Sequence, residues 1–318
     1  MIHDIAVGVD GSPASLAAAL WAAQEAERRG TGLSVVHAWY RHVRSAPYVP
    51  GDSTEHDWAE RTLQEAVRTV RAAHPGLRVT ERLVCDAPVT ALVAAAADAE
   101  MLVLGSLGLG PASGFVTGSV SQRVVARSAR PVVLVRAGRG AADEHLPAAD
   151  GLAPEEIPRT PYREVVLGLN VEHPCDELIA WAFDAARRRG TGLRVVHACR
   201  TPARHTPVPS VPLPFTDVED VPPEGQARGQ ARGQALGDAE RTVTAVLRPW
   251  REKYPAVPVT ETVTEGRAAV VLVHAARDAG LLVVGRRTNG RRIGAHSGPV
   301  THAVLHHVGC PVAVVPHD

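Results

Sequence analysis

The sequence predicts an α/β protein made of two tandem, doubly wound domains, each with a five-stranded, mostly parallel sheet and helices on both faces. Two observations support this prediction. Short apolar runs rich in Val, Leu and Ile alternate with longer segments of helical spacing, and the whole alternating pattern occurs twice in 318 residues. We expect a Rossmann-like strand order of 3-2-1-4-5 in each domain.

Near-identical segments reveal the duplication. The segment "RRGTGLSVVHA" at 28–38 returns as "RRGTGLRVVHA" at 188–198, an offset of 160 residues. Later segments are offset by 180 residues, because "RPVVLV" from Arg130 aligns with "CPVAVV" from Cys310. The additional residues fall in a Pro- and Gly-rich stretch at about 200–238, which we expect to be an extended surface loop.

The repeat also sets the expected domain limits. The first domain covers residues 1–138 and the second covers residues 162–318, and each is long enough to bury a core of its own. Residues 139–161 between them are polar and contain prolines, so we expect this segment to be a linker.

Each element of the first domain follows from its local sequence. Continuous apolar runs such as "MLVLG" are typical of buried parallel strands, whereas apolar residues three and four apart indicate helices. The first helix has Ser12 as its N-cap, Pro13 at its first position and Gly30 as its stop. In chain order we expect strands at 4–9, 32–38, 77–84, 101–105 and 131–135, and helices at 13–29, 55–73, 88–97 and 119–128.

Composition argues against several classes of protein. Lys plus Arg and Asp plus Glu both number 34, so the overall charge favours neither nucleic acid nor an anionic membrane surface as a partner. No apolar run reaches about 18 residues, and the amino terminus lacks the basic and apolar segments of a signal peptide. We therefore expect a cytoplasmic protein whose four cysteines, with no C-x-x-C pair, are reduced and structural.

A glycine-rich segment, "GSLGLGPASGFVTGSVSQRVV", begins at Gly105 after the fourth predicted strand. In doubly wound sheets, ligands bind beyond the carboxyl ends of the strands where the strand order reverses, so Asp10 and Gly105 should meet there. Glycines let backbone amides approach phosphate oxygens, and the helix start adds free N–H groups and the hydroxyls of Ser119 and Ser121. For such a loop alone, tight turning and close helix packing explain the glycines about equally well.

The spacing of Gly105, Gly108, Gly118 and Ser119 resembles the ATP-binding signature of the universal stress protein family. The resemblance extends to "VGVDGS" at the first strand and "RPVVLV" at the last, and it recurs in the second copy. It implies the adenine nucleotide alpha hydrolase-like fold, ATP as ligand with an associated Mg²⁺, and a cytoplasmic stress or dormancy regulator. Fifth strands in this family pair across a two-fold axis, so we expect that pairing between the two copies, with a homodimer as a further expectation.

The resemblance assigns roles by position. Asp10 would contact the ribose or Mg²⁺, Gly8 and Val9 would lie beside the adenosine, and the backbone of Ala38 would meet adenine. A set at the fourth strand and the following helix start would hold the phosphates: Leu104, Gly105, Gly108, Gly118, Ser119, Val120 and Ser121.

The second copy departs from this pattern. Asn170, Thr288 and Pro299 stand where the first copy has Asp, Gly and Ser, and proline removes both a hydroxyl and an amide donor. We therefore expect one competent nucleotide site, in the first copy. Four arginines of the second copy form a basic loop that either attracts an anion or, as we favour, is simply solvated: Arg286, Arg287, Arg291 and Arg292.

Other chemistry is carried by fewer residues. Asp86 aligns with Gly266, where many family members have glycine, and its carboxylate could repel phosphate or hold a metal ion. Asp86 also leaves open a phosphoacceptor role like that of response-regulator receiver domains, although that leaves the glycine spacing unexplained. His302 and His306 are four residues apart, a spacing able to bind metal, but no carboxylate partner is evident.

Enzymatic activity has little support in the sequence. It contains no activated nucleophile at motif spacing and no G-x-x-x-x-G-K-[ST] lysine for phosphoryl transfer. We favour a binding and switching module in which the nucleotide orders the glycine segment and so changes a surface seen by a downstream partner. Slow ATP hydrolysis, with Asp10 or Asp86 holding Mg²⁺, is the alternative.

Overall fold

The computed structural model describes residues 3–40, 52–106, 118–138, 141–147, 160–199, 224–288 and 298–318. Within these ranges the strands are β1 (Ile5–Gly8), β2 (Leu33–Trp39), β3 (Val79–Cys85), β4 (Leu102–Ser106), β5 (Val132–Arg136), β6 (Val165–Gly168), β7 (Leu193–Cys199), β8 (Val259–Glu265), β9 (Leu281–Arg287) and β10 (Val312–His317). The helices are α1 (Pro13–Arg29), α2 (Asp52–Ala73), α3 (Pro88–Ala97), α4 (Ser119–Arg127), α5 (Asp176–Arg189), α6 (Glu224–Lys253), α7 (Ala268–Ala275), α8 (Pro299–His307) and the short 3-10 helix η1 (Ala141–Glu144).

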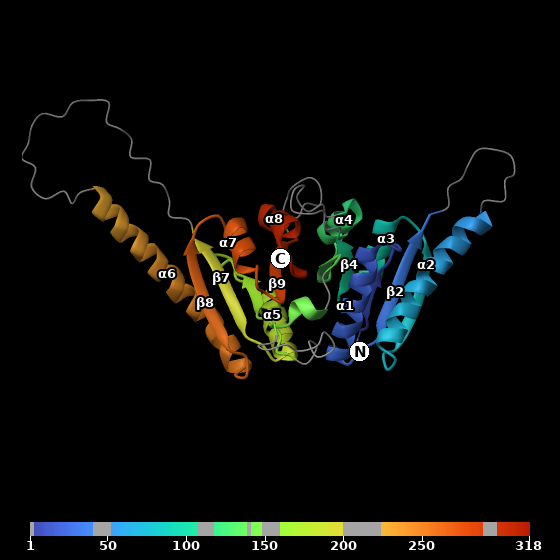
Figure 1. Cartoon of the computed structure of the whole chain (residues 1–318). Helices are drawn as coiled ribbons and strands as arrows, with labels where there is room; N and C mark the ends of the chain where they lie inside the picture. Colours follow the sequence, from blue (N-terminus) through green and yellow to red (C-terminus); the bar gives the residue numbers. More distant parts are fainter. Residues whose placement is uncertain are drawn as a thin grey trace, which may run out of the picture.

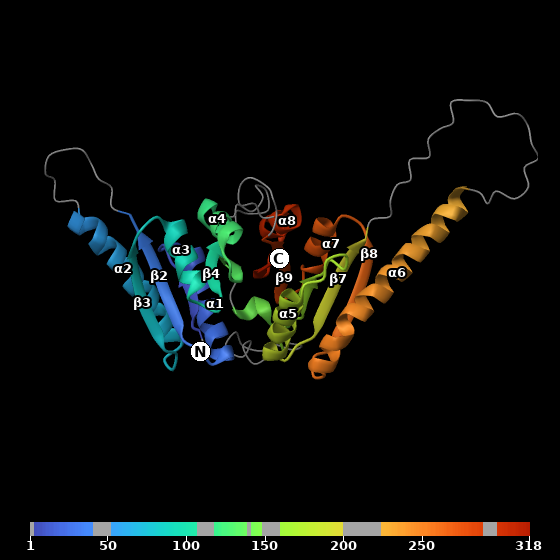
Figure 2. The same cartoon turned by 180° about the vertical axis from the view of Figure 1, so that it is seen from behind.

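The strands form one continuous sheet in the order β3-β2-β1-β4-β5-β10-β9-β6-β7-β8. The predicted order 3-2-1-4-5 is confirmed in both copies. Neighbouring strands are parallel except at the centre, where β5 and β10 pair antiparallel with Val133 opposite Ala313. The two copies therefore join through their fifth strands, and Figures 1 and 2 show them as two halves of one curved sheet.

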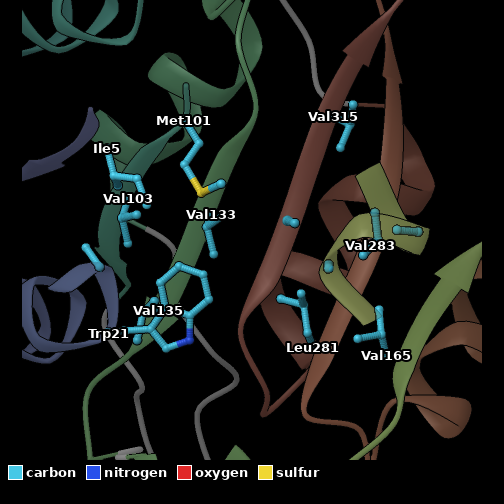
Figure 3. Close-up of a cluster of buried hydrophobic side chains, with 14 of the residues drawn as sticks. Ile5, Trp21, Met101, Val103, Val133, Val135, Val165, Leu281, Val283 and Val315 are labelled. Atoms are coloured by element: carbon cyan, nitrogen blue, oxygen red, sulfur yellow. The ribbon is translucent and has the colours of Figure 1, made fainter. Parts of the chain in front are cut away.

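Successive side chains of each strand point to opposite faces of the sheet, so the core has two layers. One layer holds Ile5 and Val7 of β1 against α1 and α2, and it continues through α5 and α6 of the second copy. Ala6 of the same strand lies in the other layer, with α3, α4, α7 and α8. Figure 3 shows the first layer crossing the joint, from Trp21 and Val133 of the first copy to Leu281 of the second.

The predicted ends of the first helix are confirmed. Ser12 accepts a hydrogen bond from the Ser15 amide at 3.1 Å, and Pro13 occupies the first turn of α1. Gly30 follows the helix with φ 65°, a left-handed conformation that glycine adopts without steric cost. α1 therefore begins directly beside the end of β1, which fixes the turn that carries Asp10.

The expected surface loop at 200–238 is wrong for its carboxyl-terminal part. α6 begins at Glu224 and continues to Lys253, so residues 224–238 are helical. The segment "GQARGQARGQALG" contains only helix-forming residues besides glycine, and each isolated glycine costs only about 1 kcal/mol relative to alanine. Pro249 lies inside this helix, whereas the prolines of 201–223 fall outside the described residues.

Two arginines join the copies beside the central strand pair. Arg136 of β5 is buried and donates to the carbonyls of Val308 and Leu305 at the carboxyl end of α8. Arg286 of β9 donates to the carbonyl of Ser128 at the end of α4. Each arginine thus supplies donors, and positive charge, to the carboxyl end of a helix in the other copy.

Candidate functional site

The carboxyl ends of β1 and β4 lie side by side at the point where the strand order reverses. The two strands are parallel, with Gly8 opposite Leu104. Asp10 follows the end of β1, and Gly105 lies near the end of β4. The structure therefore brings together the two sequence features that were expected to meet at this edge.

The Asp10 carboxylate is held in a tight turn before α1. One of its oxygens accepts from the Ser12 amide at 3.0 Å, and Gly11 between them has φ 82°. Partial burial raises the pKa of Asp10, but the hydrogen bonds from Ser12 lower it by more, so the net pKa lies below its ordinary value. The side chain is exposed at the sheet edge and negatively charged at neutral pH.

Packing explains two of the predicted glycines. A Cβ on Gly105 would lie 2.5 Å from the backbone carbon of Ala14, because the start of α1 crosses directly over β4. A Cβ on Gly8 would lie 2.6 Å from a methyl group of Leu92 and 2.7 Å from one of Leu104. The fold therefore needs glycine at Gly105, where backbone atoms are in the way, whereas at Gly8 the leucine methyl groups would have to shift.

The start of α4 has a different character. Gly118 is the N-cap without a side-chain hydrogen bond, and a Cβ built on it would meet nothing within 4 Å. Ser119 is exposed and Val120 is half-buried. Because the first N–H groups of a helix have no partner inside it, these amides are available to an anion.

Ser121 contributes to the fold as well as to this helix start. Its buried side chain donates to the Gly105 carbonyl at 3.1 Å, which ties α4 to the end of β4. In the second copy Thr301 donates to the Gly285 carbonyl at 3.3 Å in the same way. The hydroxyl is thus structural in both copies, and the Ser121 amide is the part that can face a ligand. Gly108 lies outside the described residues.

At the end of β2, Ala38 is half-buried beside aromatic residues that sequence reasoning missed. The imidazole Nδ1 of His37 lies 2.7 Å from the Val9 carbonyl and so joins the ends of β1 and β2. The Trp58 ring, from α2, lies 6.0 Å from the His37 ring. Only 4% of the chain is aromatic, so several rings near one strand end were a signal that the sequence offered.

Asp86 lies at the start of α3 rather than among these groups. Its carboxylate accepts from the Ala87 amide at 2.6 Å, and a negative charge is favoured at the amino end of a helix. The equivalent Gly266 has φ 154°, a conformation that L-residues rarely adopt. The carboxylate of Asp86 is therefore accommodated by its own helix.

In the second copy, the backbone is similar but the donors differ. Asn170 repeats the turn of Asp10, accepting from the Glu172 amide at 3.1 Å, without the charge. Pro299 occupies the first turn of α8 after the N-cap Gly298. Thr288 is bound by its amide and hydroxyl to the His317 carbonyl, at 2.7 and 3.1 Å.

The expected basic loop needs a correction. Arg286 is buried at the joint with the Ser128 carbonyl, and burial lowers its pKa, so it is neither solvated nor free to attract an anion. Arg287 is exposed, and Arg291 and Arg292 lie outside the described residues. Arginine follows Gly285 directly in the sequence, and nothing in that pattern distinguishes a buried arginine from an exposed one.

Two histidines of α8 lie close together. The rings of His302 and His306 are 4.3 Å apart, and His306 hydrogen-bonds to Gln122 of α4 at 3.0 Å. Burial and the neighbouring histidines lower the pKa of His302. Across the described ranges, no three His, Cys, Asp or Glu side chains gather as a metal site. No helix of those ranges has the length and apolar character needed to cross a membrane.

Comparison with known proteins assigns a family. The profile of the universal stress protein family matches residues 1–136 and 161–316. Universal stress protein Rv2005c of Mycobacterium tuberculosis is 34% identical over 319 residues, which cover 98% of this chain and 96% of that protein. Universal stress protein Rv2623 of the same species is 30% identical over 323 residues, covering 98% and 95%.

A solved structure supports the same assignment at the level of the fold. The crystal structure of a universal stress protein from Archaeoglobus fulgidus aligns over the full length of both chains with a TM-score of 0.65, at 15% sequence identity. The family profile covers both copies, and the relatives match nearly end to end. The chain, in which two copies of the unit share one sheet, is thus a tandem-domain member of the universal stress protein family.

Proposed function

We propose that the first copy binds one adenine nucleotide, ATP with Mg²⁺, and that the chain is a nucleotide-dependent stress regulator. One observation carries the proposal. Two copies of one fold present the same strand ends and helix start, yet only the first combines a charged Asp10 with an open helix start at Gly118 and Ser119. The second has Asn170 and Pro299 at these places.

In the first copy, the groups at the point where the strand order reverses suit the parts of a nucleoside triphosphate. The amides of Ser119, Val120 and Ser121 would receive phosphate oxygens without help from a basic side chain. The Asp10 carboxylate would supply an oxygen ligand to Mg²⁺, which binds through one or two carboxylates together with substrate phosphates. The strand ends at Val9 and Ala38 would border the adenosine.

Titration of the full chain with ATP and Mg²⁺ by isothermal calorimetry tests the proposal. We expect one site per chain. Exchanging the residues that differ between the copies gives two matched variants, Ser119→Pro and Asp10→Asn, and each should weaken ATP binding. For Ser119→Pro, which removes an amide donor, we expect a loss of about ten-fold or more. Asn170→Asp is the control in the second copy and should leave the first site unchanged.

Two results would contradict the proposal. One is a pair of equal ATP sites per chain, and the other is the absence of any nucleotide, either released by acid from the natively purified protein or bound on titration. The same samples, followed for ADP with time, separate a switch that only binds ATP from a slow Mg²⁺-dependent ATPase. Circular dichroism of each variant checks that it is folded.

A further inference from the structure

An exposed aromatic ring lies near the carboxyl ends of the strands, beside the proposed nucleotide site. Trp58 of α2 is 56% exposed, an unusual state for a tryptophan in a folded chain. Nearby, the rings of Trp39 and His56 are 5.3 Å apart, and Tyr40 is 58% exposed. Strand β2 and the first turns of α2 thus gather aromatic groups at one place.

Two contacts position Trp58 next to the turn that carries Asp10. One turn along α2, Thr62 donates to the Trp58 carbonyl at 3.0 Å, and its methyl group lies 3.2 Å from where a Cβ of Gly11 would be. On the other side, the Trp58 ring packs edge-on at 6.0 Å against His37, which is bonded to the Val9 carbonyl. The ring therefore borders the segment 9–11 at the end of β1.

His37 adds a second observation. This side chain is only 3% exposed, and its Nε2 has no hydrogen-bond partner among the described residues. Because Nδ1 faces a carbonyl oxygen, it carries a proton, and Nε2 is a buried nitrogen to which no described residue is hydrogen-bonded. A buried polar atom of this kind is expected to find a partner in the functional state.

Among its described residues, the second copy lacks this arrangement although its strand order is the same. His197 repeats the bond of His37, to the Leu169 carbonyl at 3.0 Å. The offset of 180 residues, however, places Asp238 where the first copy has Trp58, and Asp238 pairs with Arg241 on its own helix. The aromatic ring is therefore a feature of the first copy rather than of the fold.

We propose that the Trp58 ring stacks against the purine base of the bound nucleotide, and that it makes the first copy recognise the base as well as the phosphates. This inference rests on the proposed function. Base stacking on aromatic rings is a general mode of nucleotide recognition, and Trp58, at 56% exposure, leaves much of its ring accessible to a ligand. The site therefore takes nucleotides in preference to inorganic polyphosphates.

Calorimetric titration of the full chain with ATP, and competition by inorganic tripolyphosphate, test this inference in Trp58→Ala and Trp58→Phe. Trp58→Ala should bind ATP about 5-fold to 150-fold more weakly, the range expected for loss of a stacking aromatic. Trp58→Phe should stay within a few-fold of the unaltered chain. Leu146→Ala, another exposed apolar side chain at 46% exposure, is the control and should bind ATP normally.

Tripolyphosphate distinguishes the base from the rest of the site. Its affinity should be the same in Trp58→Ala as in the unaltered chain, and ATP but not tripolyphosphate should quench the fluorescence that Trp58→Phe removes. Normal ATP affinity in Trp58→Ala, or an equal loss for both ligands, overturns the stacking role while leaving the nucleotide site intact. An unaltered chain that binds no ATP overturns the proposed function and this inference together.

Discussion

The buried ion cluster between α1 and α5 gives the sharpest test of how the two copies are held together. Glu25 is fully buried, and it pairs with Arg29 at 2.6 Å, Arg28 at 2.9 Å and Arg189 of the other copy at 2.9 Å. Burial alone raises the pKa of Glu25, but the three arginines lower it well below its ordinary range. The carboxylate is thus ionised and compensates several buried cations.

Glu25→Gln keeps the size of the side chain and removes its charge. Removing one partner of a buried ion pair costs about 3–5 kcal/mol, because the other charges stay buried without compensation. Urea denaturation at pH 7 measures this loss as a difference in the free energy of unfolding. Glu27→Gln, on the same helix with a 45% exposed side chain that pairs with His74, is the control and should cost less than about 1 kcal/mol.

The difference in the free energy of unfolding between Glu25→Gln and the unaltered chain should also depend on pH. A carboxyl whose pKa is lowered by folding stabilises the protein above its unfolded value, near 4.5, and this stabilisation is lost as the pH falls through the folded pKa. The difference between Glu25→Gln and the unaltered chain should therefore be largest near neutral pH and shrink below about pH 4.5. A Glu25→Gln variant within 1 kcal/mol of the unaltered chain at pH 7 would refute the reasoning.

Three further substitutions test the joint between the copies and the site. Arg136→Ala should destabilise the chain by about 1.5–3 kcal/mol, because it leaves the carbonyl oxygens at the end of α8 without a charged donor. Thermal denaturation measures this loss, and an unchanged Tm would contradict the prediction. Gly105→Ala should cost about 1–3 kcal/mol of stability, because the new methyl group would meet the backbone of α1. Gly118→Ala, with nothing within 4 Å of its Cβ, should cost less than about 1 kcal/mol. Equal stabilities of the two variants in urea denaturation would contradict the packing role of Gly105.

The sequence predicted those parts of the fold whose signals are local. Strand order and the limits of α1 followed from alternation and from Ser12, Pro13 and Gly30, because caps and periodicity act over a few residues. The start of α6 was predicted wrongly, because glycines that weaken a helix do not prevent one when alanine, glutamine and arginine surround them.

The candidate site was predicted only in part, because several of its contacts join distant segments. The meeting of Asp10 with the end of β4 followed from topology alone. Trp58 was missed because its ring reaches the sheet edge from α2, and no spacing in the sequence relates it to His37. Arg189 was used only as part of a repeated segment, since arginine is normally exposed and burial depends on the partner Glu25.

The antiparallel pair of β5 and β10 has a consequence for stoichiometry. The fifth strand of each copy, β5 or β10, would otherwise be an edge strand, but the two pair with each other. Among the described strands, only β3 and β8 therefore lie at the edges of the sheet. The two copies are bound covalently as well, so they cannot exchange partners as free subunits do. Every molecule therefore contains one copy with Asp10 and one with Asn170, in a ratio that neither dilution nor ligand can alter.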